Sequence, residues 1–364
     1  MKTESNGSDK HLDINVRTAG GETTVKALAP VIVSASRSTD IPAFYADWMA
    51  NRLRAKYCVW YNPFNRKPSY VSFERARAFV FWSKNPAPLI PVLPEFDKKG
   101  IGYYFQFTLN DYVREGFEPN VGPLEKRIET FRTLVSKIGR ERVIWRFDPV
   151  VMGPGLDPET IAARIGAIGS RLKGHTEKLV FSFVDVAAYR KVQTNMAKTA
   201  LFGRENVLSA EASEKQIGEL CERLAALRDR WKREGWDVTL ATCAEKADLA
   251  QYGIEHNRCV DDALLRRLYP DDAKLMEYLR PMPVKGSLLA PAPAGGSGEA
   301  MPVYPACGKD QGQRKECGCV TSKDIGMYDT CAHFCAYCYA NSSSETVRRN
   351  RARHSPDSES IIGE

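Results

Sequence analysis

The stretch LEKRIETFRTLVSKIGRERVIWRFDPV, residues 124–150, contains a helical pattern followed directly by a strand pattern. In residues 124–138 the apolar side chains recur at spacings of three and four, which predicts a helix with one apolar face. Residues 142–150, RVIWRFDPV, are apolar at most positions, as expected of a strand that is covered on both faces. One helix followed by one buried strand is the repeating unit of a parallel α/β fold.

Five further short runs, rich in β-branched or aromatic residues, also predict strands: VIVSAS (31–36), FVFWSK (79–84), YYFQFTLN (103–110), KLVFSFVDV (178–186) and DVTLATCAE (237–245). Helical patterns separate them. Asp157 followed by Pro158 predicts a helix start, and Ser213 with Gln216 predicts a capping box. Six strands alternating with helices predict a parallel sheet, either a barrel or a doubly wound sheet.

Polar residues recur where these strands end, and this favours the barrel. They are Ser36, Arg37, Asp40, Ser83, Lys84, Asn85, Thr108, Asn110, Arg146, Asp148, Asp185, Thr242 and Glu245. A single strand end can be polar simply because it meets water. Barrel enzymes, however, build their sites at this face, and six strands that end alike favour a shared mouth. We therefore expect a partial (β/α)6 TIM-type barrel.

Composition divides the chain into segments. We expect a polar leader, a barrel core with an inserted hairpin, a linker rich in Pro, Gly and Ala, a cysteine-rich segment that closes the barrel, and a disordered tail. The corresponding residues are 1–29, 30–280 with the hairpin at 57–74, 281–306, 307–341 and 342–364.

The overall composition indicates where in the cell the protein works and which kinds of partner it can bind. Apolar residues make up 43% of the 364, enough for a sizeable core, and the net charge of +7 permits an anionic partner without requiring one. No apolar run is long enough to span a membrane, and the N-terminus lacks the apolar stretch of a signal peptide. We therefore expect a cytoplasmic protein without membrane contact, in which clustered cysteines bind metal or catalyse rather than form disulfides.

The segment CAHFCAYC, residues 331–338, has three cysteines, Cys331, Cys335 and Cys338. A structural zinc site normally takes four ligands, whereas a [4Fe–4S] cluster held by three thiolates keeps one iron open for a small molecule. His333 lies inside the loop, where a hydrogen-bonding role is favoured over a further ligand role.

The spacing C-x3-C-x2-C, with aromatic Tyr337 before the last cysteine, resembles the motif of the radical S-adenosylmethionine (radical SAM) enzymes. CAYCYA resembles the spore photoproduct lyase branch in particular. Similarity to that branch extends over SRSTDIPAFY (36–45), WSKNPAPLI (82–90) and residues 125–155. The whole chain is similar to a widespread bacterial family of unknown function that has this C-terminal arrangement.

In ordinary radical SAM enzymes the cysteine loop follows the first barrel strand, whereas here it lies near the end of the chain. The resemblance therefore implies a circularly permuted barrel, in which residues 323–341 return to lie beside residues 31–36. A linker as long as 281–306 permits that return.

The resemblance further implies a [4Fe–4S] cluster and S-adenosylmethionine as cofactors, generation of a 5′-deoxyadenosyl radical, and an electron donor such as flavodoxin or ferredoxin. The substrate is not readable, although nucleic acid is one candidate. Polar residues at the strand ends are the candidates for holding the cofactor: Ser83, Lys84, Gln106, Thr108, Arg146 and Asp148.

Four more cysteines are candidate ligands of an auxiliary site, either a second iron–sulfur cluster or zinc: Cys243, Cys259, Cys317 and Cys319. The alternative is that Cys243 and Cys259 are small buried residues and that the CGC segment is a turn. We expect Cys58, Cys221 and Cys307 to be structural.

Two other functions remain open at this point. The first is a zinc-binding, cysteine-rich protein that binds nucleic acid or a protein partner. The second is a non-redox barrel enzyme with a structural metal site. Iron–sulfur colour distinguishes the first from a radical SAM enzyme, because zinc is spectroscopically silent. Reductive cleavage of S-adenosylmethionine distinguishes the second.

Overall fold

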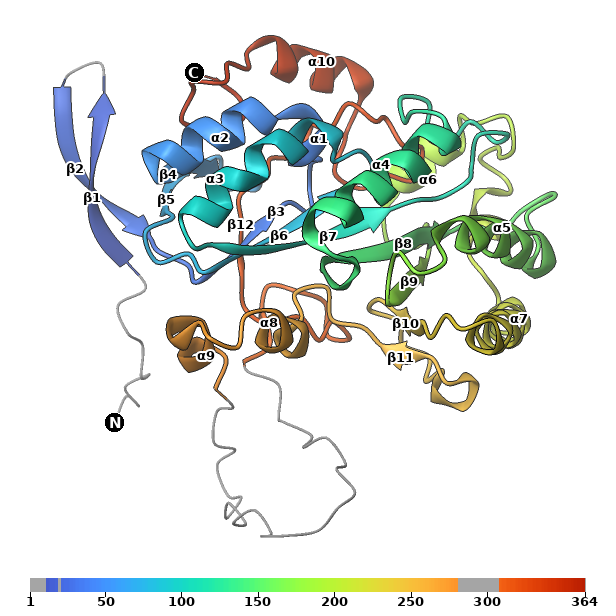
Figure 1. The fold of residues 1–364 in the computed structure, drawn as a ribbon. Coiled ribbons are helices and arrows are strands. Elements are labelled where there is room, and N and C mark those ends of the chain that lie inside the picture. Colours follow the sequence, from blue (N-terminus) through green and yellow to red (C-terminus); the bar gives the residue numbers. More distant parts are fainter. Residues whose placement is uncertain (1–10, 19–20, 281–307, 364) are drawn as a thin grey trace, which may run out of the picture.

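The computed structural model describes residues 11–18, 21–280 and 308–363, and its centre is one sheet of eight strands (Figure 1). The strands run in the order β11-β10-β9-β8-β7-β6-β3-β12, and every neighbouring pair is parallel. Their bounds are β3 (Ile32–Ala35), β6 (Ala78–Ser83), β7 (Gly102–Thr108), β8 (Val143–Val150), β9 (Lys178–Phe183), β10 (Thr239–Thr242), β11 (Glu255–His256) and β12 (Lys323–Asp324).

All six strands predicted from the sequence are present in this sheet, so the prediction of a parallel α/β fold is confirmed. Two short strands, β11 and β12, extend the sheet at its two ends. In β12, Lys323 lies opposite Val33 of β3, and Asp324 lies opposite Ser34. The segment before the cysteine loop therefore pairs beside the first long strand, as the sequence led us to expect.

Helices cover the sheet, and their bounds are α1 (Ile41–Phe44), α2 (Ala46–Ala55), α3 (Leu93–Lys98), α4 (Leu124–Ile138), α5 (Pro158–Leu172), α6 (Arg190–Met196), α7 (Glu214–Arg233), α8 (Asp262–Leu268), α9 (Ala273–Tyr278) and α10 (Ser344–Ala352). The predicted helix starts are confirmed: the Asp157 side chain caps α5, and Ser213 and Gln216 form a reciprocal capping box at α7. Within the described residues, no helix combines the length and apolar character needed to cross a membrane.

Two apolar cores lie against opposite faces of the sheet. Because side chains alternate along a strand, Phe79 and Phe81 of β6 belong to the first core, and Ala78 and Val80 belong to the second. Helices α1 to α7 contribute to the first core, together with β4, β5 and residues from the C-terminal segment. Helices α8 and α9 cover the second core together with residues from 317–320, on the other side of the sheet in Figure 1.

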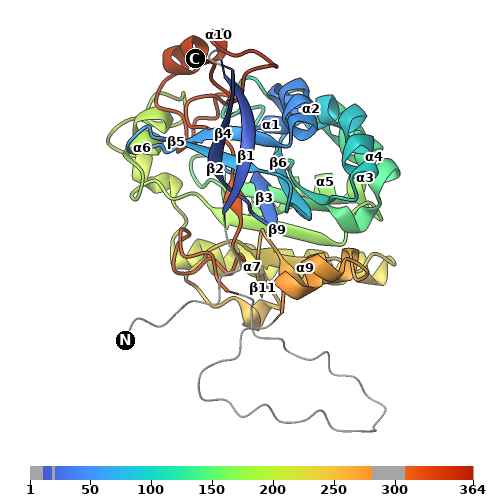
Figure 2. The ribbon, with the colours of Figure 1, turned by 90° about the vertical axis from the view of Figure 1, so that its left-hand side faces the viewer.

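Residues 11–28 correct the prediction of a polar leader over 1–29. They form β1 (His11–Thr18) and β2 (Gly21–Leu28), an antiparallel hairpin at the left-hand edge of the molecule in Figure 1, which faces the viewer in Figure 2. Exposed and less exposed positions alternate from His11 to Val16, and Val16 is buried. That period of two is the strand signal that the polar composition obscured.

The predicted hairpin at 57–74 is confirmed as β4 (Tyr57–Tyr61) and β5 (Pro68–Ser72). It is more than an insertion, because β5 also pairs in parallel with β2. The two hairpins thus make a second sheet of four strands, in the order β1-β2-β5-β4.

The C-terminal residues correct the prediction of a disordered tail over 342–364. Helix α10 is followed by a segment that docks on α2 and β4, where the Trp48 indole N–H donates to the Ser358 carbonyl at 2.9 Å and the Val59 amide donates to the Glu359 carbonyl at 2.8 Å. Ile361 and Ile362 are buried in the first core. Two apolar residues therefore anchor a segment whose composition is otherwise polar. The predicted linker 281–306 lies outside the described residues.

Replacing Ile361 with Ala should lower the free energy of unfolding by about 2–4 kcal/mol, because it leaves a cavity in the first core. Urea unfolding of the full chain measures this change. Phe64→Ala is the control: Phe64 is 95% exposed at the β4–β5 turn, so its loss should change stability by less than about 0.5 kcal/mol. Equal stability of the two variants would show that the C-terminal segment does not contribute to the core.

Candidate functional site

A cavity of about 360 Å³ lies at the carboxyl ends of the parallel strands. Its wall takes residues from the ends of β3, β6, β7, β8, β9 and β10. Two segments near the C-terminus add to the wall: residues 331–338, which we call the cysteine loop, and residues 308–320, which we call the strap. Tyr189, Val192 and Cys259 also line the cavity. Parallel strands present their carboxyl ends on one side, which is why residues far apart in sequence meet here.

The cysteine loop is held by contacts from three directions. The Tyr45 hydroxyl donates to the Thr330 carbonyl at 2.7 Å, next to Cys331. On the other side, the Ala336 amide donates to the Phe117 carbonyl at 2.8 Å, and the Asn120 side chain donates to the Ala332 carbonyl at 2.9 Å. These contacts fix the backbone of the loop independently of its sulfur atoms.

Cys331, Cys335 and Cys338 all line the cavity. Burial raises the pKa of the Cys331 thiol to about 12, and it also raises the pKa values of Cys335 and Cys338. Desolvation penalises a thiolate here, so the three thiols stay protonated unless a cation takes the place of their protons. Sulfur ligands of this kind suit soft metals and iron–sulfur clusters.

His333, inside the cysteine loop, uses its ring in protein contacts. Its Nε2 lies 2.8 Å from an Asp40 carboxylate oxygen, and its Nδ1 lies 3.5 Å from the Asn120 carbonyl oxygen. The same Asp40 carboxylate accepts the amide N–H groups of Lys84 and Ala43 at 2.7 and 3.0 Å. This geometry gives His333 a positioning role, the role favoured from the sequence.

A buried charge network lies directly beneath the loop. The Lys84 ammonium is 2.6 Å from Glu118 and 3.0 Å from the Tyr337 hydroxyl, which also donates to Glu118. Arg127 lies 3.7 Å from the second carboxylate oxygen of Glu118. Burial by itself would raise the pKa of Glu118, but Lys84 and Arg127 lower it overall, so the carboxylate stays ionised. Sequence reasoning missed Glu118, which lies in a loop without a motif.

The predicted cofactor residues on β8 already bind each other. Arg146 donates from Nε and Nη2 to one Asp148 carboxylate oxygen at 3.1 and 2.7 Å. Its Nη1 lies 3.2 Å from the Gln106 side-chain oxygen and 3.0 Å from the Cys259 sulfur. Burial would raise the pKa of Asp148, yet Arg146 lowers it overall. Each nitrogen of the guanidinium therefore already has a protein partner, and the group supports the cavity wall.

The other predicted cofactor residues divide by position. Ser83, Lys84 and Thr108 line the cavity together with Arg146 and Asp148, whereas Gln106 lies behind the wall and supports Arg146. Two further cavity residues hold polar atoms that are buried without a hydrogen-bond partner: Arg37, at Nη2, and Thr39, at Oγ1. Such atoms are costly to bury alone and mark where a polar ligand group would be stabilised.

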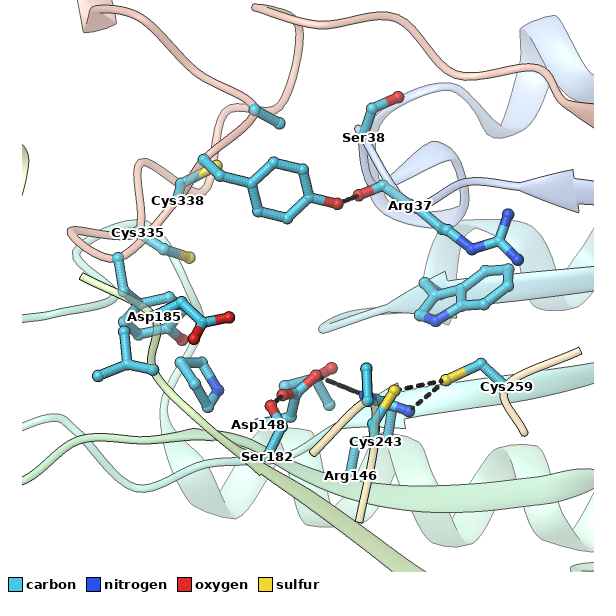
Figure 3. Close-up of a pocket in the computed structure, with 18 of the residues that line it drawn as sticks. Arg37, Ser38, Arg146, Asp148, Ser182, Asp185, Cys243, Cys259, Cys335 and Cys338 are labelled. Carbon is cyan, nitrogen blue, oxygen red and sulfur yellow. Dashed lines mark hydrogen bonds and ion pairs between the residues drawn. The ribbon is translucent and has the colours of Figure 1, made fainter. Parts of the chain in front are cut away.

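The four predicted auxiliary cysteines line the same cavity: Cys243, Cys259, Cys317 and Cys319. Figure 3 shows Cys335 and Cys338 on one side of the open space and Cys243 and Cys259 on another. The sulfur atoms of Cys243 and Cys259 are 3.2 Å apart. In the part of the chain that the structure describes, no group of three or more His, Cys, Asp or Glu side chains is arranged to hold a metal ion as it stands.

Cys58 and Cys221 are buried in the first core, away from the cavity, in agreement with a structural role. Cys307 lies outside the described residues.

Comparison with known proteins identifies a family whose function is unknown. A family model described as a domain of unknown function (DUF1848) matches residues 32–340. The match therefore includes the whole parallel sheet and both cysteine groups. A search of curated proteins finds no match to this chain.

Replacing Glu118 with Ala should destabilise the protein by about 3–5 kcal/mol, because it leaves the Lys84 and Arg127 charges buried without their partner. Adding Lys84→Met to that variant should recover part of the loss. Glu125→Ala is the matched control: it removes an exposed ion pair with Arg171 and should cost at most about 1 kcal/mol. Urea unfolding measures the free energy of unfolding of each variant. A loss of stability in E118A no larger than that in E125A would contradict the buried network.

Proposed function

We propose that this chain, which belongs to the DUF1848 family, is a radical SAM enzyme. The observation that carries the proposal is the composition of the cavity wall. Three thiols from one short loop, Cys331, Cys335 and Cys338, line the same cavity as Arg37 and Thr39, each of which has one buried polar atom without a hydrogen-bond partner. A metal-binding group and a polar small-molecule site thus share one cavity.

The three-thiol set fits a [4Fe–4S] cluster by its chemistry. Cysteine thiolates are the ligands of such clusters, and three of them leave one iron for another ligand. A cluster held by Cys331, Cys335 and Cys338 would supply, when bound and reduced by an external electron donor, the one electron needed to cleave S-adenosylmethionine into methionine and a 5′-deoxyadenosyl radical. The protein's part is to bind, orient and exclude water.

Arg37 is the residue best placed to take the carboxylate of S-adenosylmethionine. Its guanidinium lies over the Trp82 ring at 5.0 Å, which fixes its plane, and its Nη1 donates to the Ser34 hydroxyl at 3.1 Å. Its Nη2 remains without a partner. A planar, permanently charged donor suits a carboxylate. Arg146, the arginine among the candidates from the sequence, is less suited to this role because each of its guanidinium nitrogens already contacts Asp148, Gln106 or Cys259.

Other wall residues have supporting roles in this proposal. Thr39, Ser83 and Thr108 offer hydroxyl groups for the ribose and amino-acid portions of the cofactor. The ion pair between Lys84 and Glu118 holds Tyr337, and so positions the loop next to Cys338. An electron donor such as flavodoxin or ferredoxin supplies the electron, and the substrate, nucleic acid among the candidates, enters the same cavity.

We further propose that the sheet is a partial (β/α)6 barrel in circularly permuted order. The parallel pairing of β12 with β3 supports this, since it places the segment before the cysteine loop where a first barrel strand would lie. Strands β3, β6, β7, β8, β9 and β10 then supply the six units.

The proposed function is tested by anaerobic reconstitution with iron and sulfide, followed by an assay for 5′-deoxyadenosine in the presence of a reductant. The full chain should be brown and should cleave S-adenosylmethionine. Replacing Cys331, Cys335 and Cys338 together with Ala should abolish cleavage and remove about four iron atoms per chain. Cys221→Ala, a buried cysteine outside the cavity, should retain both.

Two results would overturn the proposal. One is full iron content and cleavage in the triple variant. The other is a colourless protein that contains zinc at the cysteine loop, which would favour the zinc-binding alternative.

Replacing Arg37 with Gln should weaken binding of S-adenosylmethionine by at least about tenfold, because a charge-assisted hydrogen bond is lost. Equilibrium dialysis with the reconstituted protein measures the affinity, and iron content should not change. Arg54→Gln is the control, since Arg54 pairs with Glu95 on the surface. Unaltered affinity in R37Q would assign the carboxylate to another residue.

A further inference from the structure

Cys243, Cys259, Cys317 and Cys319 come from three separate segments that the fold brings together. Cys243 directly follows β10, and Ala241, two residues earlier, belongs to the second core, so both lie on the same face of the sheet. Cys259 lies in the turn between β11 and α8. Cys317 and Cys319 lie in the strap, which reaches the site from beyond residue 307.

Backbone hydrogen bonds fix these segments relative to one another. The Asn257 amide donates to the Thr242 carbonyl at 2.8 Å, which ties the Cys259 turn to the end of β10. The Val320 amide donates to the Val260 carbonyl at 3.1 Å, which ties the strap to the same turn. The meeting of the four cysteines is therefore a property of the backbone.

The four sulfur atoms form a continuous series of contacts. Cys243 lies 3.2 Å from Cys259, sulfur to sulfur. Cys319 also forms side-chain hydrogen bonds with Cys259 and with Cys317. Cys58 and Cys221 differ from this group, because both are buried in the first core without a sulfur neighbour.

The surroundings of these sulfurs supply N–H donors. The amides of Cys259 and Val260 point at the Cys319 sulfur, at 3.2 and 3.3 Å. The Cys259 sulfur receives the Arg146 guanidinium at 3.0 Å and the Asn257 amide group at 3.5 Å. N–H donors aimed at sulfur stabilise thiolates, and they tune metal centres that thiolates bind.

We propose that Cys243, Cys259, Cys317 and Cys319 form a second metal centre, a four-thiolate site for zinc or for an iron–sulfur cluster. Four thiolates complete the coordination of either one. For a single tetrahedral ion with metal–sulfur bonds of about 2.3 Å, neighbouring sulfurs lie about 3.8 Å apart. The 3.2 Å contact between Cys243 and Cys259 is close to that value, so a small outward movement of side chains suffices.

The site has a consequence for the cavity. A metal held by all four cysteines joins the strap, the Cys259 turn and the end of β10 covalently, on the side of the cavity opposite the cysteine loop in Figure 3. A disulfide between Cys243 and Cys259 would join only two of these segments and would leave the strap cysteines unused.

This inference does not rest on the proposed function, because the two sites use different cysteines. It is therefore tested in the full chain that already carries Cys331→Ala, Cys335→Ala and Cys338→Ala. Purified anaerobically, this triple variant should retain either about one zinc, or several iron atoms with a matching amount of sulfide, per chain. Zinc and iron analyses distinguish the two.

Further changing Cys259→Ser and Cys319→Ser should lower the retained metal by at least about tenfold, since two ligands are lost. Serine nearly preserves the side-chain volume, and circular dichroism of the same samples checks that the fold is intact. Cys58→Ser and Cys221→Ser in the same background are the controls, and both should keep the metal.

Thiol labelling gives a second measurement that does not depend on these substitutions. In the folded triple variant, a chelator for zinc, or an anaerobic iron chelator for a cluster, should expose four additional cysteines to a thiol reagent. Absence of metal in the triple variant, metal that survives the double serine change, or a disulfide between Cys243 and Cys259 in its place would each overturn the inference.

Discussion

The pairing of β12 with β3 is the constraint on which the site depends. Only two residues pair, but polar contacts extend the junction: the Asp324 carboxylate accepts the Ser36 hydroxyl and the Arg37 amide, both at 2.9 Å. Gly326 lies two residues after Asp324, and a β-carbon there would lie 1.7 Å from the Ser36 hydroxyl oxygen. The chain can turn from β12 toward the cysteine loop only because residue 326 has no side chain.

The two faces of the sheet differ in the side chains that they carry. The first core is filled by large aromatic side chains under α1 to α5 and α7, and it supplies most of the buried apolar area. The second face is apolar near the start of the strands, where α8 and α9 cover it, and polar near their ends. Along β8, Ile144 belongs to the second core, and Arg146 and Asp148 follow on the same face toward the cavity. The cavity is thus the part of this face that no helix fills.

Charge is buried beneath the cavity only where it is paired. Lys84, Glu118 and Arg127 form one such group under the cysteine loop, and Arg146 with Asp148 forms another beside Cys259. In each group, the hydrogen bonds join protein side chains to one another and so hold the cavity wall in place. Arg37 and Thr39 differ, because both line the cavity and each has one buried polar atom without a hydrogen-bond partner. This contrast separates supporting residues from candidate binding residues.

The sequence by itself determined the six long strands, the capped helices and the two cysteine groups, because periodicity and caps are local properties. It did not reveal the hairpin at 11–28, whose period of two is carried by largely polar residues, nor the docking of Ile361 and Ile362. Only the tertiary structure decided that Arg146 is occupied, that Arg37 is free at Nη2, and that Glu118 supports the loop. These are pairings between residues that are distant in the sequence. The arrangement of the strand ends brings such residues together, and no local sequence pattern predicts that arrangement.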